Sequence, residues 1–169
     1  MLQSAPMLPL AEWQTFLAVE AGAAATLTGL VFVAVSINLD RIMAVPGLPG
    51  RASDSLLQLL QVFFVSGLGL VPRQPPAILA GEVLAISVAS WLCQVIGQIR
   101  YGKSRHGQPL EWLATRVILG QSSTAPLCLA GILLMLGKPS GLYWLAAGFV
   151  FSFVAGVLSA WVLLVEILR

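Results

Sequence analysis

The feature that most constrains this chain is a series of long apolar segments separated by short polar or proline-rich ones. Residues 142–165, for example, contain no charged side chain. A helix that crosses the ~30 Å hydrocarbon core of a bilayer needs about 20 residues of this kind. Of all residues, 9% are charged and 58% are hydrophobic, whereas soluble domains have about 25% charged residues. The sequence therefore predicts an all-α, polytopic transmembrane helix bundle.

Breaks in the apolar pattern divide a single domain, 1–169, into about five helices. We expect these helices over residues 13–38, 55–71, 77–99, 111–136 and 142–168. Ser53 or Asp54 is the expected N-cap of the second helix, which is short for a membrane span. Pro126 is expected to kink the fourth helix, because proline removes a backbone hydrogen-bond donor.

Basic residues are distributed unevenly between the two sides that five spans create. Two of them, Arg73 and Lys138, fall on the side of the N-terminus. Seven fall on the side of the C-terminus: Arg41, Arg51, Arg100, Lys103, Arg105, Arg116 and Arg169. Cytoplasmic loops of membrane proteins carry the excess of Lys and Arg. We therefore expect the N-terminus outside and the C-terminus in the cytoplasm, with the first apolar segment kept as a helix because no basic residue precedes it.

Two glutamates are predicted inside the bilayer at matched depths. Glu20 lies about 10 Å past Trp13 along the first helix, and Glu82 lies at a similar distance past Pro76 on the third. Carboxylates in hydrocarbon usually face a bundle interior, a water cavity or a partner. Such a pair can hold a cation or share a proton. The alternative is that each glutamate is hydrated near the interface or bonded to a neighbouring helix, and one sequence does not reveal whether the two helices are adjacent.

The fourth helix contains a polar run, Gln121, Ser122, Ser123 and Thr124, just before Pro126. A polar run beside a proline near mid-membrane is typical of the broken helices that line transporter cavities. Packing is the competing interpretation, because serine and threonine also bond to backbone groups freed by proline and mediate helix contacts.

Four glutamines and one arginine are predicted in the cytoplasmic half. Gln58 and Gln61 share one face of the second helix, and Gln94 and Gln98 share one face of the third. They form either a hydrogen-bond network between helices or the inner mouth of a polar path, and a network is the more common arrangement of amides in membranes. Arg116 lies about one turn into its helix, so its side chain is expected to extend to the cytoplasmic surface.

Small residues form ridges on two helices. Gly148, Ser152 and Gly156 recur every four residues on the last helix, and Gly22 and Gly29 mark a ridge on the first. Such ridges let helix backbones approach closely. We expect them to pack helices, either within one chain or between copies.

Other chemistry-bearing residues are few. Cys93 and Cys128 have different predicted depths, beyond the ~7 Å Cα reach of a disulfide, and both are interpreted as core residues. One histidine, His106, and dispersed carboxylates give no motif for metal binding or nucleophilic catalysis. We therefore expect no enzymatic activity and no cofactor, and we leave any metal unassigned. A net charge of +2 argues against nucleic acid as a partner.

The first helix and its exit, AGAAATLTGLVFVAVSINLDRI, resemble a segment of small uncharacterised bacterial multi-span membrane proteins. The resemblance covers residues 21–42. It implies a bacterial inner (cytoplasmic) membrane and supplies no activity.

Two functional hypotheses follow from the sequence. The first is a homo-oligomeric channel or transporter-like protein for a small cation or a proton, based on Glu20, Glu82 and residues 121–124. The second is a non-catalytic accessory subunit that docks onto a larger membrane complex through its ridges of small residues. In both hypotheses the lipid bilayer is the immediate partner.

Overall fold

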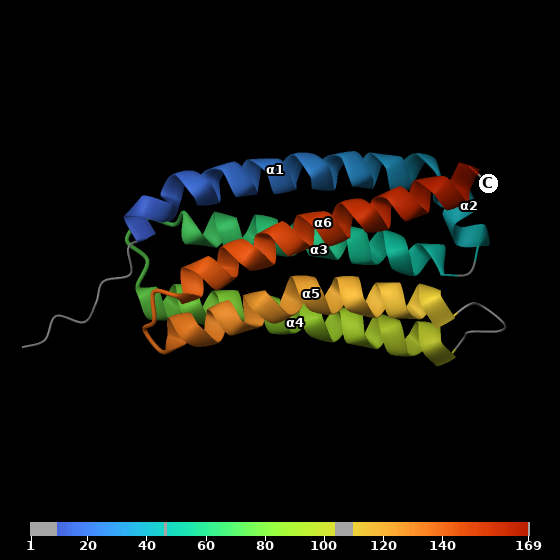
Figure 1. The fold of residues 1–169 in the computed structure, drawn as a ribbon. Coiled ribbons are helices and arrows are strands. Elements are labelled where there is room, and N and C mark those ends of the chain that lie inside the picture. Colours follow the sequence, from blue (N-terminus) through green and yellow to red (C-terminus); the bar gives the residue numbers. More distant parts are fainter. Residues whose placement is uncertain (1–9, 46, 104–109, 169) are drawn as a thin grey trace, which may run out of the picture.

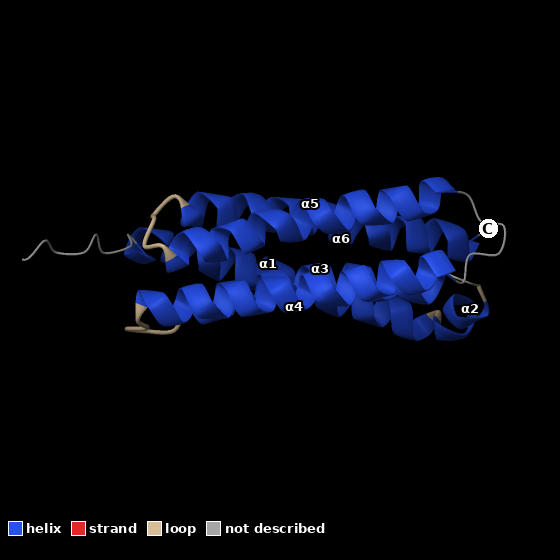
Figure 2. Ribbon diagram, turned by 90° about the horizontal axis from the view of Figure 1, so that it is seen from below, coloured by secondary structure: helices blue, strands red, loops and turns tan. Residues whose placement is uncertain are grey.

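The computed structural model describes residues 10–45, 47–103 and 110–168, and within these ranges every regular element is a helix (Figure 2). Five long helices run along an elongated bundle: α1 (Leu10–Ile37), α3 (Leu48–Gly69), α4 (Pro76–Lys103), α5 (Leu110–Met135) and α6 (Gly141–Leu168). The short helix α2 (Leu39–Ala44) lies at one end of the bundle, beside the end of α6 (Figure 1).

The two ends of the bundle carry different parts of the chain (Figure 1). The start of α1 lies at the same end as the α3–α4 and α5–α6 connections, and we call this the N-terminal end. Helix α2 and the end of α6 lie at the other end, called the C-terminal end. The predicted antiparallel path of the long helices is therefore the path that the structure has.

Four helices in the described ranges are long and apolar enough to cross a membrane. They contribute the segments Glu12–Ile37, Pro76–Gly102, Leu113–Met135 and Gly141–Val165. Helix α3 is not among them, although its 22 residues extend about 33 Å at 1.5 Å per residue. Its composition is the reason, since charged and amide side chains interrupt its apolar pattern.

Helix α3 is nonetheless the central element of the bundle. It contacts each of the other helices and packs along α1, α6 and α4. Helices α4 and α5 pack against each other, as do α5 and α6, whereas α1 packs mainly on α3. The most polar long helix is therefore enclosed by more apolar ones, and α1 is the least enclosed.

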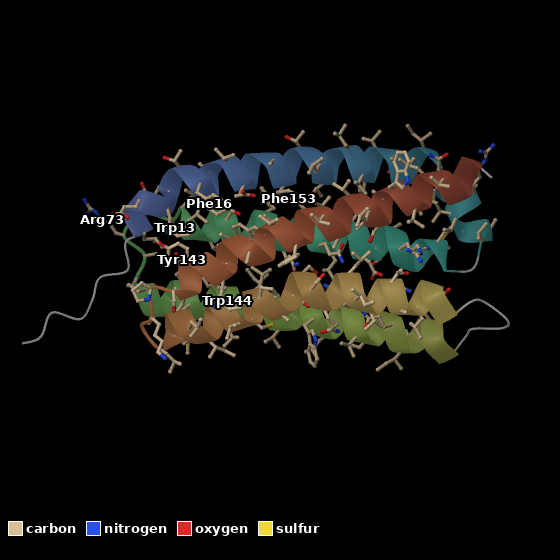
Figure 3. All side chains as sticks on the ribbon, viewed as in Figure 1. Trp13, Phe16, Arg73, Tyr143, Trp144 and Phe153 are labelled. Atoms are coloured by element: carbon tan, nitrogen blue, oxygen red, sulfur yellow. The ribbon has the colours of Figure 1, made fainter. Side chains whose placement is uncertain are left out.

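The half of the bundle toward the N-terminal end has an apolar core. Its interior is filled by side chains of α3, α4, α5 and α6, including Val65, Val83, Leu127 and Phe149. A ring cluster covers this end: Trp13 lies 5.2 Å from Tyr143 between ring centres (Figure 3). Rings at helix ends suit the interface between hydrocarbon and water.

The expected N-cap of the second helix at Ser53 or Asp54 is wrong, because α3 begins before both residues. Gly47 precedes the helix with a φ of +94°, in the left-handed region that favours glycine. A Cβ at Gly47 would also lie 2.7 Å from Cε2 of Tyr101. Pro49 occupies the first turn, where its fixed φ suits helix initiation. The helix therefore starts at residues that precede the expected range 55–71.

The other long helices begin and end within a few residues of the predicted ranges, except that α4 continues to Lys103. The six-residue helix α2 was not predicted. Helix α5 is continuous through Pro126, so the polar run before this proline does not belong to a broken helix. Arg105, His106 and Arg169 lie outside the described residues.

The variant Gly148→Leu tests the close packing of α5 and α6. A Cβ at Gly148 would lie 2.5 Å from Cδ2 of Leu127 and 3.2 Å from its backbone nitrogen. Gly148→Leu should push the two helices apart and lower the free energy of unfolding by about 1–3 kcal/mol, measured as a lower thermal midpoint in detergent. Gly22→Leu is the matched control, because no atom lies within 4 Å of its Cβ position. Equal loss in both variants would contradict this packing.

Candidate functional site

Polar side chains of α3 form a stripe that faces the protein interior. The stripe follows the helical period along one side of the helix and consists of Arg51, Asp54, Ser55, Gln58 and Gln61, all of them buried. In a soluble helix such a stripe faces water, but the neighbours of α3 on this side are α4, α5 and α6. The polar groups therefore need partners from those helices.

Arg116 of α5 forms a buried salt bridge with Asp54. Its Nε donates to Oδ2 of the carboxylate, and its guanidinium carbon lies 5.3 Å from the centre of the Tyr101 ring. Arg116 is 7% exposed and Asp54 is 9% exposed. The expectation that Arg116 extends to the surface is therefore wrong, because a carboxylate inside the bundle neutralises it.

Glutamines continue the polar interior beyond the salt bridge. Gln58 and Gln61 of α3 and Gln94 and Gln98 of α4 are buried, and Nε2 of Gln61 donates to Oγ of Ser152 at 2.8 Å. Three buried amide atoms of these four glutamines have no hydrogen-bond partner among the described residues: Gln58 Oε1, Gln61 Oε1 and Gln94 Nε2. Buried polar atoms without partners are uncommon and indicate a role beyond packing. We call these four glutamines, Asp54, Arg116 and Ser152 the polar cluster.

Glycines on three helices make room for the polar cluster. A Cβ at Gly50 of α3 would lie 2.7 Å from a terminal nitrogen of Arg116, and one at Gly97 of α4 would lie 3.5 Å from the same atom. At Gly120 of α5, a Cβ would lie 2.9 Å from Nε2 of Gln98 and would also collide with Gln94. The backbones of α3, α4 and α5 therefore fit closely around these side chains.

A pocket of about 420 Å³ opens beside the salt bridge. Asp54 and Arg116 line it together with Arg100, Tyr101 and Cys93. Its volume lies within the range of small-molecule sites, roughly 300 to 1,000 Å³. The salt bridge is thus accessible from this pocket, at the C-terminal end of α4.

The polar cluster does not extend through the bundle. Past Gln61, the next inward positions of α3 are Val62, Val65 and Ser66, whose hydroxyl donates to its own helix at the carbonyl of Val62. Leu127 of α5 and Phe149 of α6 belong to the same core as the two valines. These apolar side chains are fully or almost fully buried. One half of the interior is therefore polar and open to a pocket, and the other half is apolar and closed.

Glu20 and Glu82, the residues expected to form an ion pathway, lie on helices that do not pack together. Helix α1 packs on α3, whereas α4 packs on α5 and α3, and α1 and α4 lie on opposite sides of the bundle in Figure 1. Glu20 is partly exposed, and Glu82 accepts a hydrogen bond from Nε2 of Gln74. The fold does not bring the two carboxylates together within one chain.

The polar run on α5 bonds mainly to its own helix. The hydroxyl of Ser122 donates to the carbonyl of Leu119, and the hydroxyls of Ser123 and Thr124 donate to the carbonyl of Gly120. Gln121 Oε1 accepts a hydrogen bond from Nε1 of Trp91 on α4, at an exposed point. These hydrogen bonds stabilise turns of α5 and join α5 to α4. They therefore support the packing interpretation of the run.

The ridge on α6 lies in the interior of the chain. Gly148, Ser152 and Gly156 are buried, and Oγ of Ser55 donates to the carbonyl of Gly156 at 2.8 Å. A Cβ at Gly156 would lie 3.1 Å from Leu59. This ridge therefore lets α3 and α5 approach α6.

The ridge on α1 faces outward. Gly22 and Gly29 are exposed, with no atom within 4 Å of either Cβ position. Cys93 is also exposed, so its interpretation as a core residue is wrong; it lines the pocket instead. Cys128 is partly exposed and, like Cys93, free.

Comparisons with protein families, with curated proteins and with solved structures found no match for this chain. Among the residues that the structure describes, no group of three or more His, Cys, Asp or Glu side chains is arranged to hold a metal ion. The candidate site is therefore defined by the polar cluster and its pocket alone. Sequence reasoning found the glutamine faces but not their convergence with Asp54 and Arg116.

The salt bridge generates a second prediction. Asp54→Leu or Arg116→Met alone leaves an unpaired buried charge, and each should lower the free energy of unfolding by about 3 kcal/mol or more. The double variant removes both charges and should recover most of this loss. Unfolding in detergent micelles measures all four proteins of the cycle. Additive losses in the double variant would show that the two side chains are not coupled.

Proposed function

We propose that this protein crosses the membrane five times and carries protons or a small cation through the polar cluster. The proposal is based on the buried salt bridge between Asp54 and Arg116. Glutamines in the same polar cluster have amide atoms without a hydrogen-bond partner. Ionisable residues inside membrane bundles are rare, and they mark ion paths and proton relays. The proposed site therefore differs from the glutamate pair that the sequence suggested.

Helix α3 is the proposed fifth span. It lies lengthwise among four helices of membrane-spanning length and apolarity (Figure 1), and its polar stripe is turned away from the lipid. All its backbone groups can be satisfied within the helix, as a bilayer requires. Five spans leave the start of α1 and the end of α6 on opposite sides. The excess of basic residues supports a cytoplasmic C-terminal end, and the likeness of residues 21–42 supports a bacterial inner membrane.

A route for the proton follows from the order of polar groups. The pocket gives a proton or a cation access to the Asp54–Arg116 salt bridge. Gln58 and Gln61 continue about 10 Å along α3 and end at Ser152. Beyond that point the apolar half closes the path. This arrangement supports a transporter, in which one side is open at a time, over a permanently open channel.

Flux in reconstituted vesicles tests the proposal. Vesicles containing the protein should dissipate a pH gradient faster than empty ones, reported by a trapped pH-sensitive dye. Gln58→Leu and Gln94→Leu remove amides without leaving a charge unpaired, and each should slow flux about tenfold, equivalent to ~1.4 kcal/mol of barrier. Ser66→Ala is the matched control on α3, because its hydroxyl bonds only to its own helix at the carbonyl of Val62.

The same assay separates the polar cluster from the glutamate pair. Glu20→Gln and Glu82→Gln should leave flux unchanged if the path runs past Asp54. Loss of flux in both glutamate variants, with normal flux in Gln58→Leu and Gln94→Leu, would move the path back to the glutamates. No flux by the wild-type protein for protons, sodium or potassium would refute transport altogether.

Topology gives a further prediction. A reporter that is active only in the cytoplasm should work when fused after Arg169 and should be silent when inserted beside Lys138, because α6 separates the two sites. A second silent insertion is expected beside Arg73, at the same end of the bundle (Figure 3). An insertion beside Arg41 should be active, because α3 separates it from Arg73. Silence beside Arg41 as well as beside Arg73 would show that α3 does not cross with the other helices.

An accessory or oligomeric role is the second candidate function, and the outward ridge on α1 favours it. Gly22 and Gly29 leave the α1 backbone uncovered, as a helix needs for close approach to another membrane helix. Co-purification of larger chains, lost in Gly22→Leu, would support an accessory subunit. A homo-oligomer that loses its assembly in the same variant would support self-association.

A further inference from the structure

A series of three hollows, which we call the groove, follows the surface of α3 from α1 past α2 to the pocket beside the salt bridge, and neighbouring hollows share lining residues. We propose that an anionic phospholipid binds in it, with an acyl chain along α3 and the phosphate in the pocket near Arg100. The proposal needs insertion into a membrane but does not require transport.

The apolar part of the groove consists of two neighbouring hollows. One, of about 550 Å³, lies between α1 and α3 and is lined by Gly29, Phe32 and Phe63. The other, of about 380 Å³, lies between α2 and α3. Leu56 and Leu60 line both hollows. Gly29, from the outward ridge of α1, therefore forms part of one wall of the groove.

The groove joins the polar pocket at three residues of α3. Pro49, Ser53 and Leu57 line both the second hollow and the pocket. On the pocket side the charged lining residues are Arg100, Arg116 and Asp54. An amphipathic ligand that follows the groove therefore passes from a hydrocarbon surface to a site with a net positive charge.

The length of the groove fits one lipid chain. Helix α3 rises about 21 Å between Phe63 and Pro49, compared with about 15 Å for half of the hydrocarbon core. The polar pocket lies at the C-terminal end, where headgroups of one leaflet would be. A chain in the groove and a headgroup in the pocket thus match the depth of a single leaflet.

Charge selects the class of lipid. The described side chains at the C-terminal end include Arg41, Arg51, Arg100 and Arg116 against Asp40 and Asp54. Clusters of basic residues at the membrane surface attract anionic headgroups. A second copy of the chain in the same orientation would bring two positively charged ends together, which disfavours it as the occupant.

Lipid retention tests the proposal. Protein extracted from vesicles of equal parts phosphatidylcholine and phosphatidylglycerol is examined by native mass spectrometry, which counts the bound lipids of each class. We expect phosphatidylglycerol to be retained preferentially, and Arg100→Gln to lower that preference about fivefold. Arg41→Gln is the matched control, because Arg41 lies at the same end but does not line the pocket. Leu57→Trp should block the junction and release both lipids.

Each other outcome identifies a different occupant and overturns the proposal. Equal falls in Arg100→Gln and Arg41→Gln would indicate general attraction to a basic surface. Equal retention of both lipids would show that the groove does not select an anionic headgroup, and a lipid-free dimer would assign the groove to a second copy. Circular dichroism of each variant verifies its fold. If Leu57→Trp does not fold, Arg100→Gln still tests the proposal, because it changes an exposed side chain.

Flux is measured separately in phosphatidylcholine vesicles. Absent flux with phosphatidylglycerol still retained refutes the proposed function alone. Normal flux without lipid preference refutes the lipid site alone.

Discussion

The rest of the structure depends on the burial of one salt bridge. Either charge alone inside the bundle would be strongly destabilising, so α3 and α5 must keep the alignment that joins Asp54 to Arg116. Helix α4 must then fit around the same guanidinium, with Gly97 facing its terminal nitrogen and Tyr101 facing its carbon. One electrostatic requirement thus fixes the relative positions of three helices.

The salt bridge and the apolar core lie in different halves of the bundle. Toward the N-terminal end, Val65, Leu127 and Phe149 belong to an apolar core, where dispersion contacts are collectively large. Toward the C-terminal end, amides and charges occupy the same kind of interior position. The apolar half therefore supplies packing, and the polar half holds the candidate site.

The sequence predicted the helices well because bilayer length and apolar composition leave few alternatives, as in residues 142–168. The predicted start of α3, at residue 55, is too late. Gly47, with its left-handed φ, and Pro49, with its fixed φ, begin the helix instead. The pairing of Glu20 and Glu82 stays a prediction, although the fold does not bring them together within one chain. Helix rise gives the depth of Glu20 and Glu82 but not the direction in which each side chain points. The faces of Gln58 and Gln94 were recognised, yet only the tertiary arrangement shows that Arg116 is buried against Asp54 in the same half of the bundle.

The separation of the salt-bridge partners along the chain has a consequence for biogenesis. Asp54 and Arg116 are 62 residues apart, so the ribosome completes α3 and α4 before the arginine exists. Until α5 is synthesised, the Asp54 carboxylate therefore lacks the arginine that forms its salt bridge in the folded bundle. A chain truncated before Arg116 would never form this contact, so α3 and α4 depend on a later part of the chain for their final alignment.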